Sequence, residues 1–214
     1  MATEERTTWP AFRSCRVRND AVPLHEAARM IAHRQVRGSV HLFNAYTLSL
    51  ASKDAKLAQV LEQSTLNLPD GMPLIWIARR LGLDHMTERV YGPDLMHLVL
   101  DPGQRTGFRH YLYGSTPEVL DALQHKLSCR WPNALVTGVE SPPFRGISDS
   151  ELKRSVRQFE TSGADVVWVG MGTPAQDTIS RRMAEIGASA YVAVGAAFDF
   201  IGETKRQAPP WMQR

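Results

Sequence analysis

A continuous apolar run from Ala164 to Gly170 is the feature that most constrains the fold of this chain. Strands that are buried on both faces, as in a parallel sheet, show such runs instead of alternating apolar and polar residues. A segment with helical character follows from Pro174 to Ile186, and a second apolar run extends from Ala190 to Val194. Because parallel strands need crossover connections, usually helices, this order predicts a parallel sheet covered by helices.

The same alternation extends over most of the chain. The other strand-like segments span residues 39–44, 65–68, 108–113 and 134–139. The other helical segments span residues 22–36, 46–63, 72–81, 94–100 and 149–162, with one more that begins at Pro117. Strands and helices in alternation are typical of the α/β class. We therefore predict an α/β fold with a mainly parallel sheet flanked by helices.

The chain has 214 residues, enough for one large α/β domain or for two small lobes. We expect two lobes, because Asp101-Pro102-Gly103-Gln104 groups residues that interrupt regular structure. Residues 1–20 then form a polar, poorly ordered lead-in, and residues 21–103 form an N-terminal α/β lobe. Residues 104–203 form a C-terminal lobe, and residues 204–214 begin a basic C-terminal segment.

Charge and cysteine content exclude several classes of protein. The formal net charge is only +3, and no basic stripe with interleaved aromatic residues indicates nucleic acid. Such a charge suits an acidic substrate or an anionic membrane surface. Cys15 and Cys129 are far apart, which disfavours a disulfide framework and fits a reducing compartment. We expect no signal peptide in the charged residues 1–20 and no membrane-spanning run of about 18 apolar residues.

Asp70 is the first candidate for a catalytic base. It lies between Pro69 and Gly71, where a short apolar run stops and a helical pattern begins. An acid at the carboxyl end of a parallel strand projects into the crevice where open α/β sheets bind ligands. A helix cap is the alternative role for this side chain.

Polar groups at other strand ends are candidates for substrate binding, and each has a structural alternative. Gly172 lies in a glycine-containing turn that opens a helix, where backbone amides favour anions, although a plain turn also explains it. Gln176, in the first turn of that helix, can donate to and accept from a sugar or a base. Asn44 and Asp199 follow two predicted strands, and each either contacts a ligand hydroxyl or only caps a turn.

Three basic residues are candidate phosphate ligands. Arg89 either places its guanidinium on a phosphate or forms a surface ion pair with its neighbour Glu88. Lys205 and Arg206 begin a tail that mixes basic residues with Trp and Met. That mixture suits a membrane interface or a pyrophosphate, and an ordinary solvated tail is the alternative.

Metal-binding patterns are missing from the sequence. The seven histidines form no HxxxH or HExxH spacing, and the chain contains no Asp-x-Asp pair. Neither a Walker A pattern nor a GxSxG pattern occurs. We therefore expect no metal site and no other cofactor.

Five motifs, in order over most of the chain, resemble those of the WecG/TagA/CpsF family of bacterial glycosyltransferases. One departure within them is an Asp where the family has Glu, at position 177. The motifs are Phe43-Asn44-Ala45, Leu68-Pro69-Asp70-Gly71, Glu88-Arg89-Val90-Tyr91-Gly92-Pro93-Asp94-Leu95, Gly172-Thr173-Pro174-Ala175-Gln176-Asp177, and the run from Phe198 to Pro209.

The resemblance implies a Rossmann-like fold and inverting transfer of a sugar from a UDP-sugar to a polyprenyl-diphosphate-linked sugar, without a metal. It implies that Asp70 is the base, with Asn44, Arg89 and Gln176 in the substrate pocket. Asp199 would help to hold the donor, and helix amides with Arg89, Lys205 or Arg206 would stabilise the departing UDP. Members work at the cytoplasmic face of the membrane, in the synthesis of cell-surface polysaccharide or teichoic acid.

Two departures from the family pattern matter. Leu42 stands where members with a Thr two residues before the Asn carry a hydroxyl. Family chains also run past the position of Arg214 with a basic, aromatic segment that covers the site and touches the membrane, so we expect this chain to be shortened there. The resemblance implies transfer of a sugar of the N-acetylmannosamine type or a related hexose, and the sequence is compatible with a homo-oligomer.

Two other functions compete with this reading. A non-catalytic partner that binds a nucleotide sugar in a polysaccharide assembly is the first. An NAD-dependent oxidoreductase with Gly170-Met171-Gly172 as its phosphate turn is the second. Against the second, the third glycine of the dinucleotide pattern is missing, and no acid follows about 20 residues later, where Ala190 and Tyr191 stand.

Overall fold

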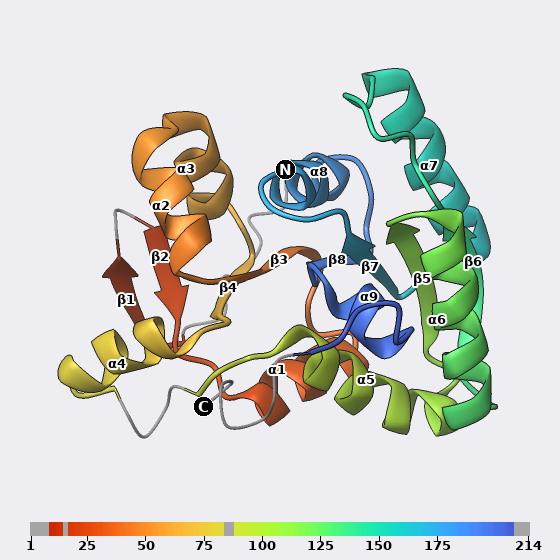
Figure 1. Cartoon of the computed structure of the whole chain (residues 1–214), viewed down its shortest axis with the longest axis horizontal. Helices are drawn as coiled ribbons and strands as arrows, with labels where there is room; N and C mark the ends of the chain where they lie inside the picture. Colours follow the sequence, from red (N-terminus) through yellow and green to blue (C-terminus); the bar gives the residue numbers. More distant parts are fainter. Residues whose placement is uncertain (1–8, 15–16, 84–87, 208–214) are drawn as a thin grey trace.

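The computed structural model describes residues 9–14, 17–83 and 88–207 of the chain (Figure 1). Its centre is a sheet with strand order β4-β3-β8-β7-β5-β6, in which every neighbouring pair is parallel. The strands are β3 (Gly38–Phe43), β4 (Leu66–Pro69), β5 (Arg109–Gly114), β6 (Leu135–Glu140), β7 (Val166–Gly170) and β8 (Ala190–Ala193). The predicted α/β class is therefore confirmed, in a Rossmann-like arrangement.

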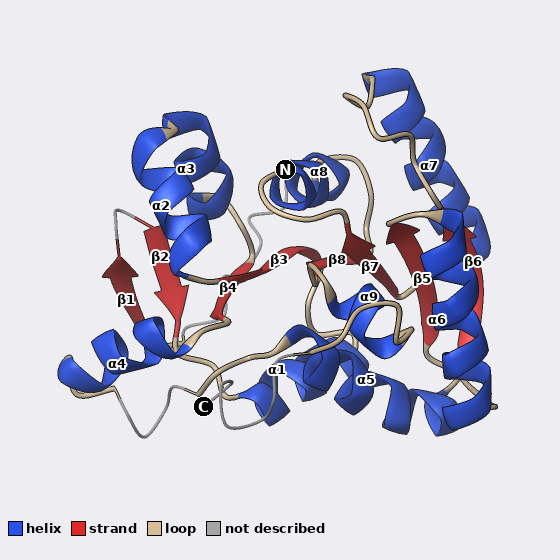
Figure 2. Ribbon diagram, viewed as in Figure 1, coloured by secondary structure: helices blue, strands red, loops and turns tan. Residues whose placement is uncertain are grey.

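Helices lie on both sides of this sheet (Figure 2). One side is covered by α1 (Leu24–Ala32), α5 (Gly92–Thr106), α6 (Pro117–Arg130) and α9 (Ala197–Ile201). The other side is covered by α7 (Asp149–Ser162) and α8 (Ala175–Ala184). Beyond β3 and β4 lie α2 (Ala45–Lys53), α3 (Ala55–Glu62) and α4 (Met72–Arg80).

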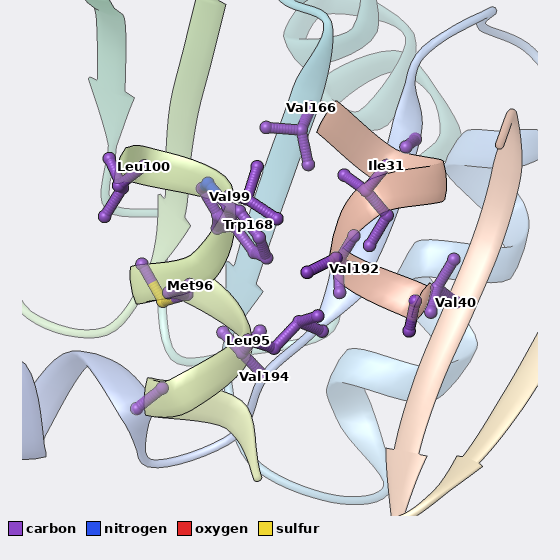
Figure 3. Close-up of a cluster of buried hydrophobic side chains, with 14 of the residues drawn as sticks. Ile31, Val40, Leu95, Met96, Val99, Leu100, Val166, Trp168, Val192 and Val194 are labelled. Atoms are coloured by element: carbon purple, nitrogen blue, oxygen red, sulfur yellow. The ribbon is translucent and has the colours of Figure 1, made fainter. Parts of the chain in front are cut away.

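The apolar run that predicted a buried strand forms β7, and all five of its residues are buried. Successive side chains of a strand point to opposite faces, so this strand contributes to two cores. Val166 and Trp168 pack with α1 and α5, as Figure 3 shows, while Val167 and Val169 pack with α7 and α8. Burial on both faces explains why the run lacks polar alternation.

The polar lead-in predicted for residues 1–20 is wrong where the structure describes it. β1 (Ala11–Ser14) and β2 (Val17–Asp20) pair antiparallel in a small sheet. Val17 is buried in a cluster with helices α2 and α3, and the Asp20 carboxylate accepts from the backbone N–H of Asn67 at 2.8 Å. The prediction failed because these short strands carry charged residues, and only tertiary contacts satisfy them. Residues 1–8 lie outside the described residues.

The interruption of regular structure predicted at residues 101–104 is also wrong. Helix α5 continues through Pro102 to Thr106, beyond the predicted end at Leu100. Val99, Leu100 and Gly103 are buried, and packing of this face offsets the hydrogen bond that proline removes. β8 pairs with both β3 and β7, so a single sheet crosses the predicted lobe boundary. The lobe ranges 21–103 and 104–203 stay a prediction.

The helix predicted over residues 46–63 is two helices, because Asp54 interrupts it. The Asp54 carboxylate accepts from the backbone N–H groups of Lys56 and Leu57 and so caps the start of α3. A side chain that competes for backbone donors favours a helix start over a helix interior. Helix α7, in contrast, has the predicted bounds, and a capping box between Ser148 and Glu151 defines its start.

Candidate functional site

A cavity of about 710 Å³ opens at the carboxyl ends of the central strands, and we call it the first cavity. In open α/β sheets this edge is where ligands bind. Its lining includes five of the residues singled out in the sequence, which are Asn44, Asp70, Arg89, Gly172 and Gln176. They come from four separate segments, three that follow β3, β4 and β7 and one that precedes α5. The sheet therefore brings together residues up to 132 positions apart.

Asp70 lies in the short connection between β4 and α4. Its backbone N–H donates to the carbonyl of Phe43 at 2.9 Å, which fixes the junction against the end of β3. The side chain retains 22% of its exposure, and Oδ1 accepts from Nε of Arg89 at 3.0 Å. The carboxylate caps no helix: α4 begins after Gly71 without a side-chain cap. The capping alternative for Asp70 is therefore excluded.

The surroundings of Asp70 act on its pKa in opposite directions. Burial raises the pKa of the carboxyl above its ordinary value, and this is the largest effect. The neighbouring Arg89 guanidinium lowers the pKa by charge and hydrogen bonding, and the more distant Asp94 carboxylate raises it. The net direction is upward, which suits a carboxylate that must accept a proton.

Arg89 is held in place by two further contacts. The backbone N–H of the next residue, Val90, donates to the carbonyl of Pro69 at 2.8 Å, which ties the 88–91 segment to β4. The guanidinium lies over the ring of Tyr91, 4.3 Å from its centroid. Arg89 thus contacts Asp70 and Tyr91. The carboxylate of Glu88, its alternative partner in the sequence, accepts from the backbone N–H of Leu24.

Asn44 does cap a helix, as its structural alternative proposed. Its Oδ1 accepts from the backbone N–H groups of Tyr46 and Thr47, at 3.0 and 3.2 Å, at the start of α2. The residue is nevertheless exposed and lines the first cavity. Because Oδ1 is occupied, Nδ2 is the group of Asn44 that can donate to a ligand.

Gln176 joins two loops at the opposite side of the first cavity. The side chain is 2% exposed, and its Oε1 accepts from the backbone N–H of Gly172 at 3.1 Å and of Gly195 at 3.0 Å. Both glycines have positive φ angles, 77° and 59°, that other residues rarely adopt. The N–H of Gly172 is thus used within the protein, and a role of this residue in anion binding stays a prediction. Only Nε2 of Gln176 remains to contact a ligand.

A second cavity, of about 730 Å³, adjoins the first and shares Gly172, Gly195 and Ala196 with it. Asp199 and Lys205, predicted near the substrate, line this second cavity and pair with each other at 3.0 Å. Arg206 is exposed and lines neither cavity. The structure thus divides the predicted substrate-binding residues between two adjoining spaces, and it leaves Arg206 outside both.

Several lining residues were missed in the sequence. Tyr46, Trp76 and Tyr91 supply aromatic surface to the first cavity, and Phe144 and Arg145 contribute to the second. Tyr91 had a detectable signal, since it stands two residues after Arg89 in a motif that was already noted. Aromatic residues that are common in apolar cores carry no such signal until the fold shows which of them face a cavity.

A buried hydrogen bond joins β3 to α8, next to the residues that line the first cavity. Nδ1 of His41, on β3, is 2.9 Å from Oδ1 of Asp177, on α8, and both side chains are fully buried. This contact anchors α8 to the sheet one residue after Gln176. His41 therefore lies in the protein core, with Asp177 as its hydrogen-bond partner.

Two features are absent from the described ranges, 9–14, 17–83 and 88–207. No group of three or more His, Cys, Asp or Glu side chains there is placed to hold a metal ion. No helix within these ranges is both long and apolar enough to cross a membrane.

The chain matches the model of one protein family over nearly its full length. The family is described as "Glycosyl transferase WecG/TagA/CpsF family", and the match covers residues 12–214. The matched range contains both cavities and all of the residues that the motifs placed near the substrate. The chain therefore belongs to the WecG/TagA/CpsF family of glycosyltransferases.

Proposed function

We propose that the chain is an inverting glycosyltransferase that uses a UDP-sugar as donor and a polyprenyl-diphosphate-linked sugar as acceptor. The observation that carries this proposal is the Asp70–Arg89 pair in the first cavity, at 3.0 Å, beside Asn44 and Gln176. The proposal includes the synthesis of cell-surface polysaccharide or teichoic acid, at the cytoplasmic face of the membrane. The transferred sugar would be of the N-acetylmannosamine type or a related hexose.

In the proposed reaction, the acceptor hydroxyl gives its proton to the carboxylate of Asp70. The hydroxyl oxygen forms a bond to the anomeric carbon of the donor, and the bond from that carbon to the UDP oxygen breaks. UDP leaves with the electron pair on the side opposite to the attack, which inverts the anomeric configuration. Arg89 orients the carboxylate and lowers the Asp70 pKa that burial raises, which favours the ionised form that a base requires.

The two cavities suggest how the substrates divide. We assign the reacting sugars to the first cavity and the nucleotide to the second, across the shared wall of Gly172, Gly195 and Ala196. When the donor binds, the Lys205–Asp199 ion pair would break and Lys205 would contact the diphosphate. The freed carboxylate of Asp199 would then accept a hydrogen bond from a hydroxyl of the donor. Arg206, exposed on the same segment, would approach only if that segment rearranges on binding.

We also propose that no metal takes part. The donor set supports this, because among the described residues each cavity is lined by a single carboxylate, Asp70 in the first and Asp199 in the second. Hard divalent cations bind through several oxygen ligands, and one carboxylate is a poor start for such a site. The positive charge of Lys205 and the dipole at the start of α8 would instead stabilise the departing UDP.

The test is a UDP-release screen over several UDP-sugars, with and without a lipid-diphosphate-linked sugar acceptor, in buffer with and without EDTA. We expect release that requires the acceptor and persists in EDTA. UDP binding without release for any donor would favour a non-catalytic assembly partner. NADH binding in a fluorescence titration, with no UDP binding, would favour an oxidoreductase. Loss of release in EDTA would overturn only the metal-free part of the proposal.

A further inference from the structure

Helix α4 carries apolar residues on two faces instead of one. Leu74, Ile75 and Ala78 are buried against the body of the protein. On the opposite face, Trp76, Ile77 and Leu81 are 59%, 42% and 58% exposed. An ordinary surface helix buries one apolar stripe and presents polar residues to water.

The exposed residues of α4 follow helical spacing. Positions 73, 76, 77, 80 and 81 are related by steps of three and four, so they share one face of the helix. Four of these five are apolar, and Arg80 is the fifth. The stripe is thus continuous, and α4 lies at the outer edge of the molecule (Figure 1). We call residues 73, 76, 77 and 81 the outer stripe of α4.

The outer stripe begins inside the first cavity. Pro73 and Trp76 line that cavity, whereas Ile77 and Leu81 do not. Tyr46, which is 62% exposed at the start of α2, also lines it. A ligand with a polar head near Asp70 and an apolar tail would therefore find apolar surface along its way out. The other large exposed apolar residues of the described ranges are Leu135 and Val139 on β6, and Phe144 and Ile186 in loops far from α4 in the sequence.

Positive charge accompanies the outer stripe. Arg79 and Arg80 are both exposed, in the last turn of α4. Tryptophan beside aliphatic side chains, flanked by arginine, is the composition that interfacial helices use at a bilayer surface. Arginine near an anionic leaflet is attracted to its headgroups. A second protein would also cover apolar residues, but it would not require this charge.

We propose that the outer stripe of α4 docks this protein on an anionic lipid bilayer, with Trp76, Ile77 and Leu81 in the interface and Arg79 and Arg80 at the headgroups. Docking in this way turns the mouth of the first cavity toward the lipid, so a lipid-linked acceptor reaches Asp70 without leaving the membrane. The inference rests on the proposed function for its purpose. Its test does not need turnover.

Vesicle flotation tests the proposal directly. The protein should float with vesicles of phosphatidylcholine mixed with phosphatidylglycerol, and much less with phosphatidylcholine alone. Ile77→Ser with Leu81→Ser should weaken binding to the mixed vesicles roughly tenfold or more, because it removes two aliphatic side chains that docking would bury in the bilayer. Arg79→Gln with Arg80→Gln should remove most of the dependence on phosphatidylglycerol. The matched control is Leu135→Ser with Ile186→Ser, of 46% and 44% exposure, which should bind as the unmodified chain does.

Fluorescence locates the contact. Brominated lipid should quench part of the tryptophan emission, and Trp76→Phe should remove most of that quenching while the protein still floats. If Trp211→Ser, at a position outside the described residues, abolishes flotation while the Ile77/Leu81 variant floats normally, the assignment to α4 is overturned. If the Ile77/Leu81 variant changes only the oligomeric mass in light scattering, the stripe is an interface between copies and the proposal is again overturned.

Two controls separate this inference from the proposed function. Asp70→Asn should float as the unmodified chain does, because it leaves α4 untouched. The Ile77/Leu81 variant should keep its UDP release with a short, water-soluble acceptor, since neither residue lines a cavity. Failure of UDP release with normal flotation would therefore contradict the proposed function alone, and normal release without flotation would contradict docking alone.

Discussion

The side of the first cavity built on β3 and β4 presents side chains, whereas the side built on β7 and β8 presents backbone. On the first side, the side chains of Asp70 and Arg89 are 22% and 25% exposed, and both charged groups line the first cavity. On the second side, Gln176 is 2% exposed and uses its oxygen to hold two glycine loops in place. One side therefore presents charged side chains to the cavity, and the other side holds the cavity's backbone loops in place.

This difference predicts how substitutions separate activity from stability. Partly exposed charged side chains contribute little to folding, so their removal should affect chemistry first. A buried acceptor that satisfies two backbone donors contributes to both, because each unpaired donor in the interior costs free energy. Variants on the two sides should therefore differ in the ratio of lost activity to lost stability.

Asp70→Asn is the substitution with the largest expected effect on transfer. The amide cannot accept the acceptor proton, so we expect UDP release with acceptor to fall by about 10²-fold to 10⁴-fold, with little change in thermal unfolding. Asp94→Asn, an exposed acid that also influences Asp70, is the matched control and should remain active. Acceptor-dependent release near the normal rate in Asp70→Asn would remove Asp70 from the role of base.

Gln176→Leu should affect both properties. The loss of Oε1 leaves the N–H groups of Gly172 and Gly195 without their partner, so we expect the free energy of unfolding to fall by about 2–4 kcal/mol. Transfer should fall as well, because both loops border the two cavities. Gln176→Glu keeps an acceptor oxygen and should recover part of the stability in chemical denaturation. Equal stability of Gln176→Leu and the unmodified chain would show that the two hydrogen bonds from Gly172 and Gly195 to Gln176 do not stabilise the fold.

The pH dependence of transfer should report on the ionisation of Asp70, beside Arg89. Burial raises the pKa of Asp70, and the base must be deprotonated, so transfer should decline on the acid side above the ordinary aspartate value of about 3.9. Arg89 lowers this pKa, so Arg89→Gln should move the acid limb to higher pH. Arg80→Gln, an exposed arginine outside both cavities, should leave the limb in place. A limb that does not move in Arg89→Gln would argue that another group titrates.

Asn44 gives the smallest expected change and the finest distinction. Asn44→Ala should cost about 1 kcal/mol of stability through loss of the α2 cap, and Asn44→Ser should keep that cap. If Nδ2 contacts a substrate, both variants should lose transfer by a similar few-fold factor while only Asn44→Ala loses stability. Full activity of Asn44→Ser would show that Asn44 acts only as a cap.

Local patterns in the sequence predicted much of the fold. The uninterrupted run at 164–170 predicted the buried strand β7, and the helical pattern over residues 149–162 predicted α7. The predictions failed where a local signal was overridden by packing. Pro102 indicates a helix end, yet buried Val99, Leu100 and Gly103 carry α5 past it. The β1–β2 hairpin carries charged residues whose partners lie on distant segments.

The site was predicted less evenly. Five of the predicted residues do line one cavity, and these are Asn44, Asp70, Arg89, Gly172 and Gln176. Four of them follow strands of one parallel sheet, and Arg89 lies in a segment that is hydrogen-bonded to the end of β4. Asp199 and Lys205 also follow a strand, yet they turn toward the second cavity. Nothing local in the sequence distinguishes these directions, since the path of the chain after β8 sets them. The roles of all seven residues remain predictions for the experiments above.

By itself, the sequence determined the α/β class, most of the helices and strands, and the polar residues at the strand ends, because apolar periodicity and turn chemistry act over a few neighbouring residues. Only the tertiary structure decided the strand order, the pairing of Asp70 with Arg89, the use of Oε1 of Gln176 within the protein, and the exposure of the outer stripe of α4. Each of these depends on contacts between segments far apart in the chain. Such contacts form when the whole core packs, and no short stretch of sequence carries their energy.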